Sequence, residues 1–116
     1  MSYTGSCHCG AVAFEVEGDA PTAAMSCNCS HCRRKGLLLD FVPIDQFRVT
    51  SGEEATTEWL FNKHKIEHRF CETCGCQPFA TGVGPGGARM AAINLRCVPS
   101  IDLDGLTLKK IDGASF

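Results

Sequence analysis

The chain has 116 residues, of which 44% are hydrophobic and 21% are charged, and its formal net charge is −2. This composition is typical of a globular protein and excludes a largely disordered chain. The slight negative charge gives no electrostatic reason to expect a nucleic-acid or membrane-surface partner. No apolar run approaches the roughly 18 residues that a membrane-spanning helix needs. Length and the absence of a linker together predict one domain over residues 1–116.

Alternating apolar residues and the glycine or proline breaks between them predict a mainly β fold. The candidate strands are residues 11–17, 37–42, 58–61, 66–70, 89–96 and, as a last edge strand, 106–111. Residues 62–65 are predicted to form a hairpin turn and the glycine-rich residues 80–87 a loop. Short helical turns are expected at 30–35, capped by Ser30, and at 43–47. The aromatic residues Trp59, Phe61 and Phe70 fall in strand patterns and are expected in the core.

Nine of the residues are cysteine, which is near the level of a stapled scaffold. The N-terminus has no basic region followed by an apolar stretch, so we expect a cytoplasmic protein without a signal peptide. Disulfides are rare in such a reducing compartment, and an odd number of cysteines cannot all pair within one monomer. The cysteines are therefore expected to be thiolates on metal, with disulfides as the weaker alternative.

Eight of the nine cysteines fall in three clusters, which are Cys7-x-Cys9, Cys27-x-Cys29-x-x-Cys32 and Cys71-x-x-Cys74-x-Cys76. Pairs of cysteines at short spacing supply two thiolates to one zinc ion, which takes four ligands in a tetrahedron. Gly75, directly after the second cysteine of a C-x-x-C pair, permits the positive φ of a metal knuckle. Joining Cys7 and Cys9 to Cys71 and Cys74 would close a loop of about 60 residues and brace the fold.

The middle cluster then has three thiolates and no obvious fourth partner. Three protein ligands and a free position are the pattern of catalytic zinc sites. Other pairings satisfy the same counts, and Cys76, His31 or the lone Cys97 could close the second site. Because Cys97 follows a predicted strand, we expect it to be a small buried hydrophobe.

These motifs together resemble the glutathione-dependent formaldehyde-activating family, also called the centromere-protein-V-like family. The matching stretches cover nearly the whole chain and are Gly5-Ser6-Cys7-His8-Cys9-Gly10, Cys27-Asn28-Cys29-Ser30-His31-Cys32-Arg33, His68-Arg69-Phe70-Cys71-Glu72-Thr73-Cys74-Gly75 and Ile93-Asn94-Leu95-Arg96-Cys97. The resemblance implies a small β-rich fold described as a β-tent, with two zinc ions per chain. It implies a structural ion at Cys7, Cys9, Cys71 and Cys74, and a reactive ion at Cys27, Cys29 and Cys32.

The activity that the resemblance implies is the joining of glutathione to formaldehyde to give S-hydroxymethylglutathione, which is carbon–sulfur lyase chemistry. In this interpretation zinc at the second cluster activates the small thiol, and His31 or His68 is a candidate proton carrier. Arg33, Arg34 or Lys35 could hold a glutathione carboxylate.

Two alternatives stay open. The first is a non-catalytic zinc module that binds a protein or nucleic acid through its basic residues, although the net acidic charge makes nucleic acid the less favoured partner. The second is a redox or metal sensor in which mild oxidation of the second cluster releases zinc.

Overall fold

The computed structural model describes residues 1–61, 66–83 and 87–111, and its fold is mainly β, as the sequence predicts. The predicted turn at 62–65 lies outside the described residues. The strands are β1 (Ser2–Ser6), β2 (Ala13–Glu17), β3 (Ala23–Cys27), β4 (Leu39–Pro43), β5 (Phe47–Ser51), β6 (Thr56–Phe61), β7 (Ile66–Cys71), β8 (Phe79–Val83), β9 (Arg89–Asn94) and β10 (Thr107–Ile111). The helical elements are α1 (Ser30–Lys35) and the single 3-10 turns Ile44–Gln46, Glu53–Ala55, Leu95–Cys97 and Leu103–Gly105.

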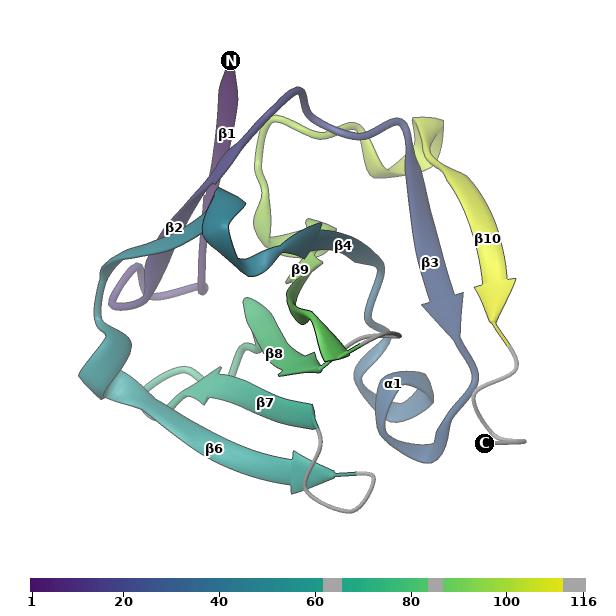
Figure 1. The fold of residues 1–116 in the computed structure, drawn as a ribbon. Helices are drawn as coiled ribbons and strands as arrows, with labels where there is room; N and C mark the ends of the chain where they lie inside the picture. The colour runs from purple at the N-terminus through teal and green to yellow at the C-terminus, as the bar shows by residue number, and fades with distance from the viewer. Residues whose placement is uncertain (62–65, 84–86, 112–116) are drawn as a thin grey trace.

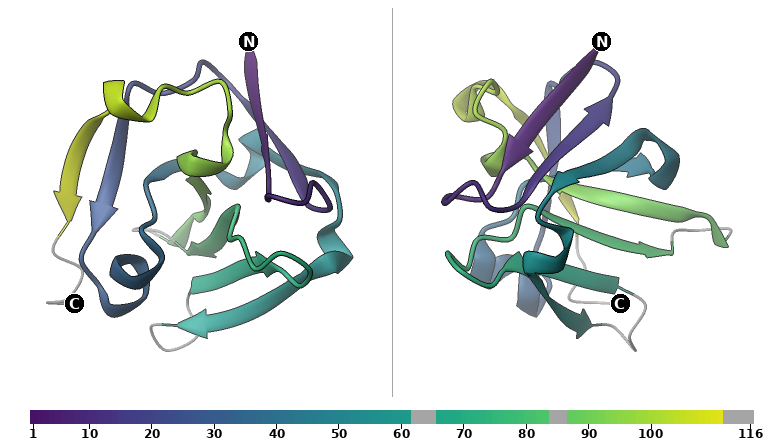
Figure 2. Two further views of the ribbon diagram at one scale, coloured as in Figure 1. Left: turned by 180° about the vertical axis from the view of Figure 1, so that it is seen from behind. Right: turned by 90° about the vertical axis from the view of Figure 1, so that its left-hand side faces the viewer.

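The strands form two sheets (Figure 1). The smaller sheet has the order β1-β2-β5 and the larger has the order β10-β3-β4-β9-β8-β7-β6. The pairs are antiparallel except that of β10 with β3, which is parallel. The predicted last strand thus does lie at a sheet edge. Figure 2 shows the small sheet set at an angle to the large one.

The core fills the space between the two sheets. Three phenylalanine rings meet there, with Phe47 of β5 at 4.8 Å and Phe14 of β2 at 6.4 Å from Phe79 of β8, between ring centroids. Aromatic pairs at such separations contribute beyond the apolar area that they bury. A second link joins the sheets at Tyr3 of β1, whose hydroxyl donates a 2.7 Å hydrogen bond to the Asp40 carboxylate of β4. Burial and this bond raise the pKa of Tyr3, which keeps the hydroxyl a donor.

Several sequence expectations need correction. The glycine-rich segment was expected to be a loop from residue 80, but β8 runs to Val83, between β7 and β9. Phe79 and Ala80 are buried there, and this burial outweighs the low strand propensity of the glycine that follows. β1, β3 and β5 were not predicted, because each has few large apolar residues. Trp59 is not in the core, since its side chain is 56% exposed on the edge strand β6.

The helix α1 crosses from β3 to β4 and packs on the large sheet. The Cys32 side chain of this helix is buried in a small apolar cluster with Leu37, Leu39, Ala80 and Ala92. The N-cap is Cys29 rather than Ser30, because the Cys29 Sγ accepts a hydrogen bond from the Cys32 amide. Within the described ranges no helix has the length and apolar character to cross a bilayer.

Candidate metal centres and the adjoining pocket

Seven of the nine cysteines gather into two groups whose sulfur atoms all lie within 4.8 Å of one another inside each group. The first group, called here the four-cysteine cluster, is Cys7, Cys9, Cys71 and Cys74. The second, called the three-cysteine cluster, is Cys27, Cys29 and Cys32. Both groups could hold a metal ion, and their membership is the one that sequence spacing favoured. Cys76, Cys97 and His31 have ligand atoms in neither group of the described chain.

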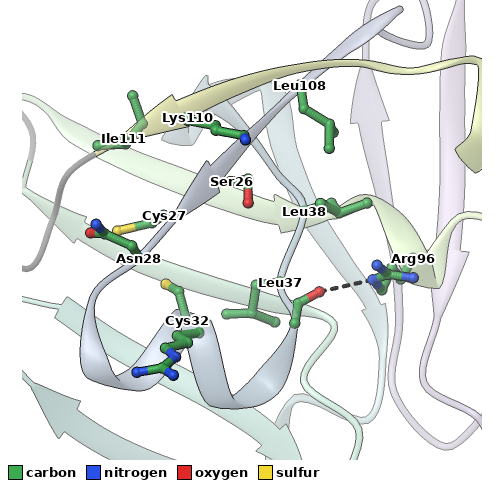
Figure 3. Close-up of a pocket in the computed structure, with 12 residues that line it drawn as sticks. Ser26, Cys27, Asn28, Cys32, Leu37, Leu38, Arg96, Leu108, Lys110 and Ile111 are labelled. Atoms are coloured by element: carbon green, nitrogen blue, oxygen red, sulfur yellow. Dashed lines mark hydrogen bonds between the residues drawn. The ribbon is translucent and has the colours of Figure 1, made fainter.

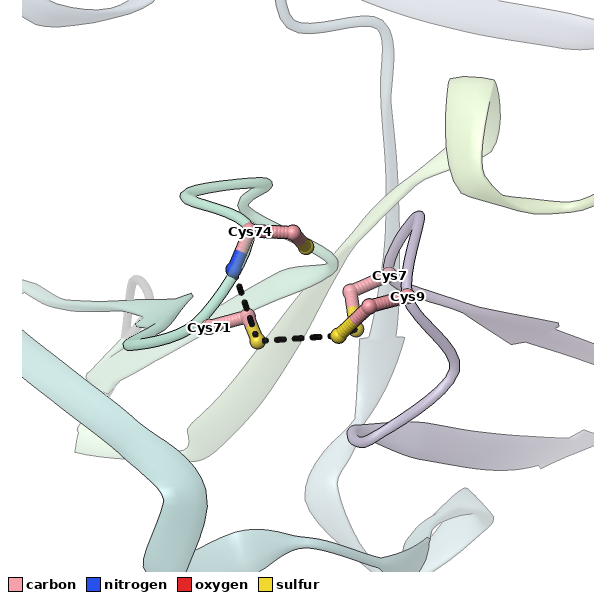
Figure 4. Close-up of side chains that lie close together, drawn as sticks. All are labelled: Cys7, Cys9, Cys71 and Cys74. Carbon is pink, nitrogen blue, oxygen red and sulfur yellow. Dashed lines mark hydrogen bonds between the residues drawn. The ribbon is translucent and has the colours of Figure 1, made fainter.

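The four-cysteine cluster joins the two sheets (Figure 4). Cys7 follows β1 of the small sheet, and Cys71 ends β7 of the large sheet. The Cys9 Sγ lies 3.7 Å from that of Cys7 and 3.6 Å from that of Cys71. Tetrahedral zinc with Zn–S bonds of about 2.3 Å places its sulfurs about 3.8 Å apart. The sulfurs are thus spaced as such a site requires.

The backbone around the four-cysteine cluster favours thiolates. The Cys71 Sγ accepts hydrogen bonds from the amides of Thr73 at 3.4 Å and Cys74 at 3.5 Å. The amides of Cys76 and Cys9 lower the pKa of Cys74 to about 5. Gly75 has φ of +79°, which confirms the positive φ expected after the C-x-x-C pair. The knuckle is thus built to hold negative sulfur before any ion is considered.

The three-cysteine cluster is built from one short stretch of chain. Cys27 is the last residue of β3, Cys29 caps α1 and Cys32 lies in its first turn. The Cys27 Sγ accepts from the Cys29 amide at 3.5 Å, and the Cys29 Sγ accepts from the Cys32 amide at 3.4 Å. Because α1 follows β3 after two residues, the three sulfurs converge from one local stretch of chain.

A cation would stabilise the negative charges that the three-cysteine cluster forms when its thiols ionise. Burial acts to raise the pKa of Cys29, but the amide of Cys32 and the neighbouring thiols outweigh it, so this pKa lies below its ordinary value. Burial, together with the neighbouring thiols, raises the pKa of Cys32. One thiolate therefore forms at the expense of the next, since like charges oppose each other. A soft divalent cation would remove that conflict and hold all three as thiolates.

A pocket of about 570 Å³ adjoins the three-cysteine cluster (Figure 3). Cys27 and Cys32 lie at one end of it, and Leu38, Leu108 and Arg96 lie toward the other. The lining includes three cations, Arg33, Arg96 and Lys110, and no acidic side chain among the described residues. Arg96 is held in place because its Nε donates a 2.8 Å hydrogen bond to the carbonyl oxygen of Gly36.

Arg96 and Lys110 were missed as site residues by the sequence reading. Lys110 reaches the pocket because β10 pairs in parallel with β3, which sets Lys110 opposite Ser26 and Ile111 opposite Cys27. Arg96 reaches it from the 3-10 turn after β9, the strand that pairs with β4. A pairing between segments some eighty residues apart leaves no local signal in the sequence. Arg33, by contrast, was a candidate from its place beside the cluster, and the structure does bring it to the pocket.

The histidines suggested as proton carriers lie elsewhere. His31 and His68 stack with ring centroids 3.8 Å apart, and neither lines the pocket beside Cys27 and Cys32. The Gln77 side chain bridges them, with Oε1 3.0 Å from His31 Nε2 and Nε2 2.8 Å from His68 Nδ1. Burial, reinforced by the charges of His31 and Lys35, lowers the pKa of His68 to about 4. His68 is therefore neutral at physiological pH.

The remaining cysteines also have defined surroundings. Cys97 lies in the 3-10 turn after β9, where its Sγ accepts from the Asn94 side-chain amide at 3.7 Å and faces the Gln77 carbonyl at 3.8 Å. Burial and the nearby Cys76 raise its pKa to about 12, so it stays a protonated thiol. Cys97 was expected to be a small buried hydrophobe, but it is only partly buried at the edge of the core and contacts two polar groups.

Comparison with known proteins places these sites in a family. A family model described as "Glutathione-dependent formaldehyde-activating enzyme" matches residues 2–100. The crystal structure of a Rhodobacter sphaeroides protein, a structural-genomics target, is similar with a TM-score of 0.78 and 29% sequence identity. That similarity covers 91% of this chain and 99% of the other. With most of its length matched, and with both cysteine clusters assembled inside the matched region, the chain belongs to the glutathione-dependent formaldehyde-activating family.

Proposed function

We propose that the protein binds two zinc ions and activates a small thiol, glutathione in the first instance, for addition to an aldehyde such as formaldehyde. It would act as a carbon–sulfur lyase of the S-hydroxymethylglutathione synthase type. The observation that carries this proposal is the three-cysteine cluster at the wall of a cationic pocket. Three thiolates leave one position of a tetrahedral ion for an incoming ligand.

The chemistry of the donor set favours a thiol over water as that ligand. Zinc held by three thiolates is a weak Lewis acid, and when bound here it would keep an incoming thiol deprotonated and nucleophilic at neutral pH. In the four-cysteine cluster the four sulfurs fill every position, so we assign the zinc of that cluster a structural role.

The pocket residues would bind and orient the thiol. Glutathione carries two carboxylates at neutral pH, and Arg33, Arg96 and Lys110 offer three cations without a competing acid among the described lining. Arginine can bind a carboxylate through two parallel hydrogen bonds, which fixes its orientation as well as its position. The arginines would therefore hold the two ends of the molecule while its sulfur lies beside Cys27 and Cys32.

The reaction then needs one bond and one proton. The sulfur forms a bond to the carbonyl carbon, the C–O π bond breaks, and the aldehyde oxygen takes a proton to become a hydroxyl. The Ser26 hydroxyl and the Lys110 ammonium line the same pocket and are the candidate donors. His31 and His68 are less suited, because they face Gln77 instead.

The test is whether the protein accelerates adduct formation. Glutathione and formaldehyde combine spontaneously, so the exchange rate between free glutathione and S-hydroxymethylglutathione is measured by NMR with and without protein. We expect a faster exchange with the native chain and none of that acceleration with Cys29→Ser. A native, fully zinc-loaded protein that leaves the spontaneous rate unchanged would overturn the proposal.

In the non-catalytic alternative, the basic residues would bind a protein or nucleic acid and not a small thiol. Nucleic-acid binding needs cations grouped on one face, yet α1 directs Arg33 to one pocket and Arg34 and Lys35 to another on its far side. This division favours two small-molecule sites over one phosphate-binding surface. A binding titration with mixed-sequence single-stranded DNA at two salt concentrations would separate the alternatives, because only phosphate binding falls steeply with salt.

A further inference from the structure

A second pocket lies across α1 from the three-cysteine cluster, between the helix and strands β6 and β7. Its volume is about 480 Å³, within the range of small-molecule sites. It is lined by Ser30, His31, Arg34, Lys35, Trp59 and Phe70. Helix spacing explains the separation from the first pocket. Ser30, His31, Arg34 and Lys35 stand at positions i, i+1, i+4 and i+5, which share one side of a helix. Cys32 and Arg33 lie on the opposite side.

The floor of this pocket is aromatic. In the β6–β7 pair Trp59 lies opposite His68, and Thr57 lies opposite Phe70. Directly paired residues share a face, and so do residues two apart along a strand, so Trp59, His68 and Phe70 face the same side of the sheet. α1 lies near β6 and β7 (Figure 1). It is on that side of the sheet, because His31 stacks on His68 and the Lys35 Nζ lies 4.8 Å from the Phe70 ring centroid.

The exposure of Trp59 needs a reason. It is the chain's one tryptophan and is 56% exposed, although tryptophan is normally among the more buried residue types. The other face of the same strands is polar, since Arg69 pairs with Glu58 at 3.0 Å and Arg89 pairs with Glu67 at 3.1 Å. The exposed ring therefore lies on the face toward α1 and the pocket, not on the ion-paired outer face.

The walls of the pocket are cationic, and no ion pair with a described residue neutralises them. Within the described residues neither Arg34 nor Lys35 forms an ion pair, and no acidic side chain lines the pocket. The Arg34 Nη1 donates a 2.9 Å hydrogen bond to the Ser30 carbonyl, which holds the guanidinium along the helix. The pocket thus combines a flat π surface with two cations at its rim.

From this juxtaposition we propose that the pocket is a second ligand site, which takes a small aromatic carboxylate with its ring on Trp59 and its carboxylate between Arg34 and Lys35. An aromatic ring matches the indole face by offset stacking. The carboxylate completes charge-assisted hydrogen bonds with the two cations. The site uses no metal ligand, so it does not depend on the thiol chemistry proposed for the other side of α1.

The lone tryptophan makes the test direct. Quenching of its fluorescence by 4-nitrobenzoate is titrated on the zinc-loaded native protein, with nitrobenzene and acetate as the ring-only and carboxylate-only controls. We expect saturable quenching by 4-nitrobenzoate with an unchanged fluorescence lifetime for the residual signal. Binding should be at least about tenfold weaker for each control compound, because each offers one of the two interactions.

Variants on the two sides of α1 form the matched pair. Lys35→Gln and Arg34→Gln should each weaken 4-nitrobenzoate binding about tenfold, whereas Arg33→Gln should leave it unchanged. Trp59→Leu, at an exposed position, should abolish the saturation-transfer NMR signal of the compound while the thermal unfolding curve stays cooperative. Unsaturable quenching, equal binding of nitrobenzene, or an Arg33→Gln effect as large as that of Lys35→Gln would overturn the proposal.

Discussion

The two cysteine clusters differ in how the chain assembles them. The four-cysteine cluster draws on two sheets and on residues 62 positions apart, and Cys7 and Cys71 are 2% and 0% exposed within the core. The three-cysteine cluster comes from six consecutive positions around the start of α1 and lies at the wall of a pocket. A long-range cluster with two of its cysteines in the core restrains the whole fold, whereas a local cluster at a pocket can lose or exchange a ligand without unfolding the chain.

The largest expected effect comes from breaking the four-cysteine cluster. Structural zinc in small domains contributes about 10–16 kcal/mol to folding, against a total stability of about 5–15 kcal/mol for an ordinary domain. Cys71→Ser should therefore abolish the cooperative thermal transition followed by circular dichroism. Cys76→Ala, which changes a cysteine outside both clusters, is the control and should keep the transition.

Cys29→Ser tests the other side of the comparison. A serine hydroxyl caps a helix well, so α1 keeps its N-cap when the Cys29 sulfur is lost. We expect a cooperative transition, a loss of helix-cap stability below about 1 kcal/mol, and a fall in zinc content from two ions to one by elemental analysis. If Cys29→Ser unfolds as completely as Cys71→Ser, the division into a structural and a reactive site is wrong.

Chelation should remove the two ions at separate rates. An ion at the three-cysteine cluster would keep one position for a competing ligand from the adjoining pocket, whereas an ion at the four-cysteine cluster would have all four positions filled, with Cys7 and Cys71 buried in the core. Zinc release to excess chelator, followed with a chromogenic zinc indicator, should show a fast and a slow phase of equal amplitude. Only the slow phase should remain in Cys29→Ser, and a single phase in the native protein would contradict the assignment.

Thiol binding should distinguish neighbouring arginines on α1. Arg33 lines the pocket beside Cys27 and Cys32, whereas Arg34 lines the pocket across the helix. A hydrogen bond between charged groups contributes about 1.5–3 kcal/mol, so Arg33→Gln should raise the KM for glutathione about tenfold or more with little change in kcat. Arg34→Gln carries the same charge change and should leave KM unaltered. Equal effects of the two variants would mean that only net charge matters.

A loss of stability far smaller than that of Cys71→Ser, with no loss of zinc, is expected at the metal knuckle backbone. Gly75 has φ of +79°, and a methyl group there would meet no atom within 4 Å, so only backbone strain opposes a side chain. Gly75→Ala should lower the free energy of unfolding by about 1–2 kcal/mol. The measurement is urea denaturation of the zinc-loaded protein, and both ions should remain bound. A loss of the structural ion would show that the turn tolerates far less strain than this.

The sequence predicted the grouping of the cysteines better than the architecture around it. Short cysteine spacings indicate which thiolates can converge, and the structure has both clusters with the membership that the spacing favoured. The strands with several large apolar residues, such as β2 and β9, were also predicted. β3 was missed because Ala23–Cys27 has only small or flexible side chains, and it becomes a strand through pairing with β10 and β4.

The pocket could not be predicted for the same reason. Arg96 and Lys110 reach it through strand pairings that connect distant parts of the chain. Trp59 was expected in the core because its strand alternates, but β6 is an edge strand, and part of its inward face extends beyond the cover of α1. Periodicity identifies which face a residue is on, but not whether that face is covered.

The central claim, that one zinc site is closed and the other has an open position for a thiol, is tested most directly by zinc-edge X-ray absorption with and without glutathione. With four sulfurs at one site and three at the other, the mean should be about 3.5 sulfurs per zinc without the thiol and should rise toward four when glutathione is added. A mean of four sulfurs that glutathione leaves unchanged would show that the second site is already closed, and would contradict the account.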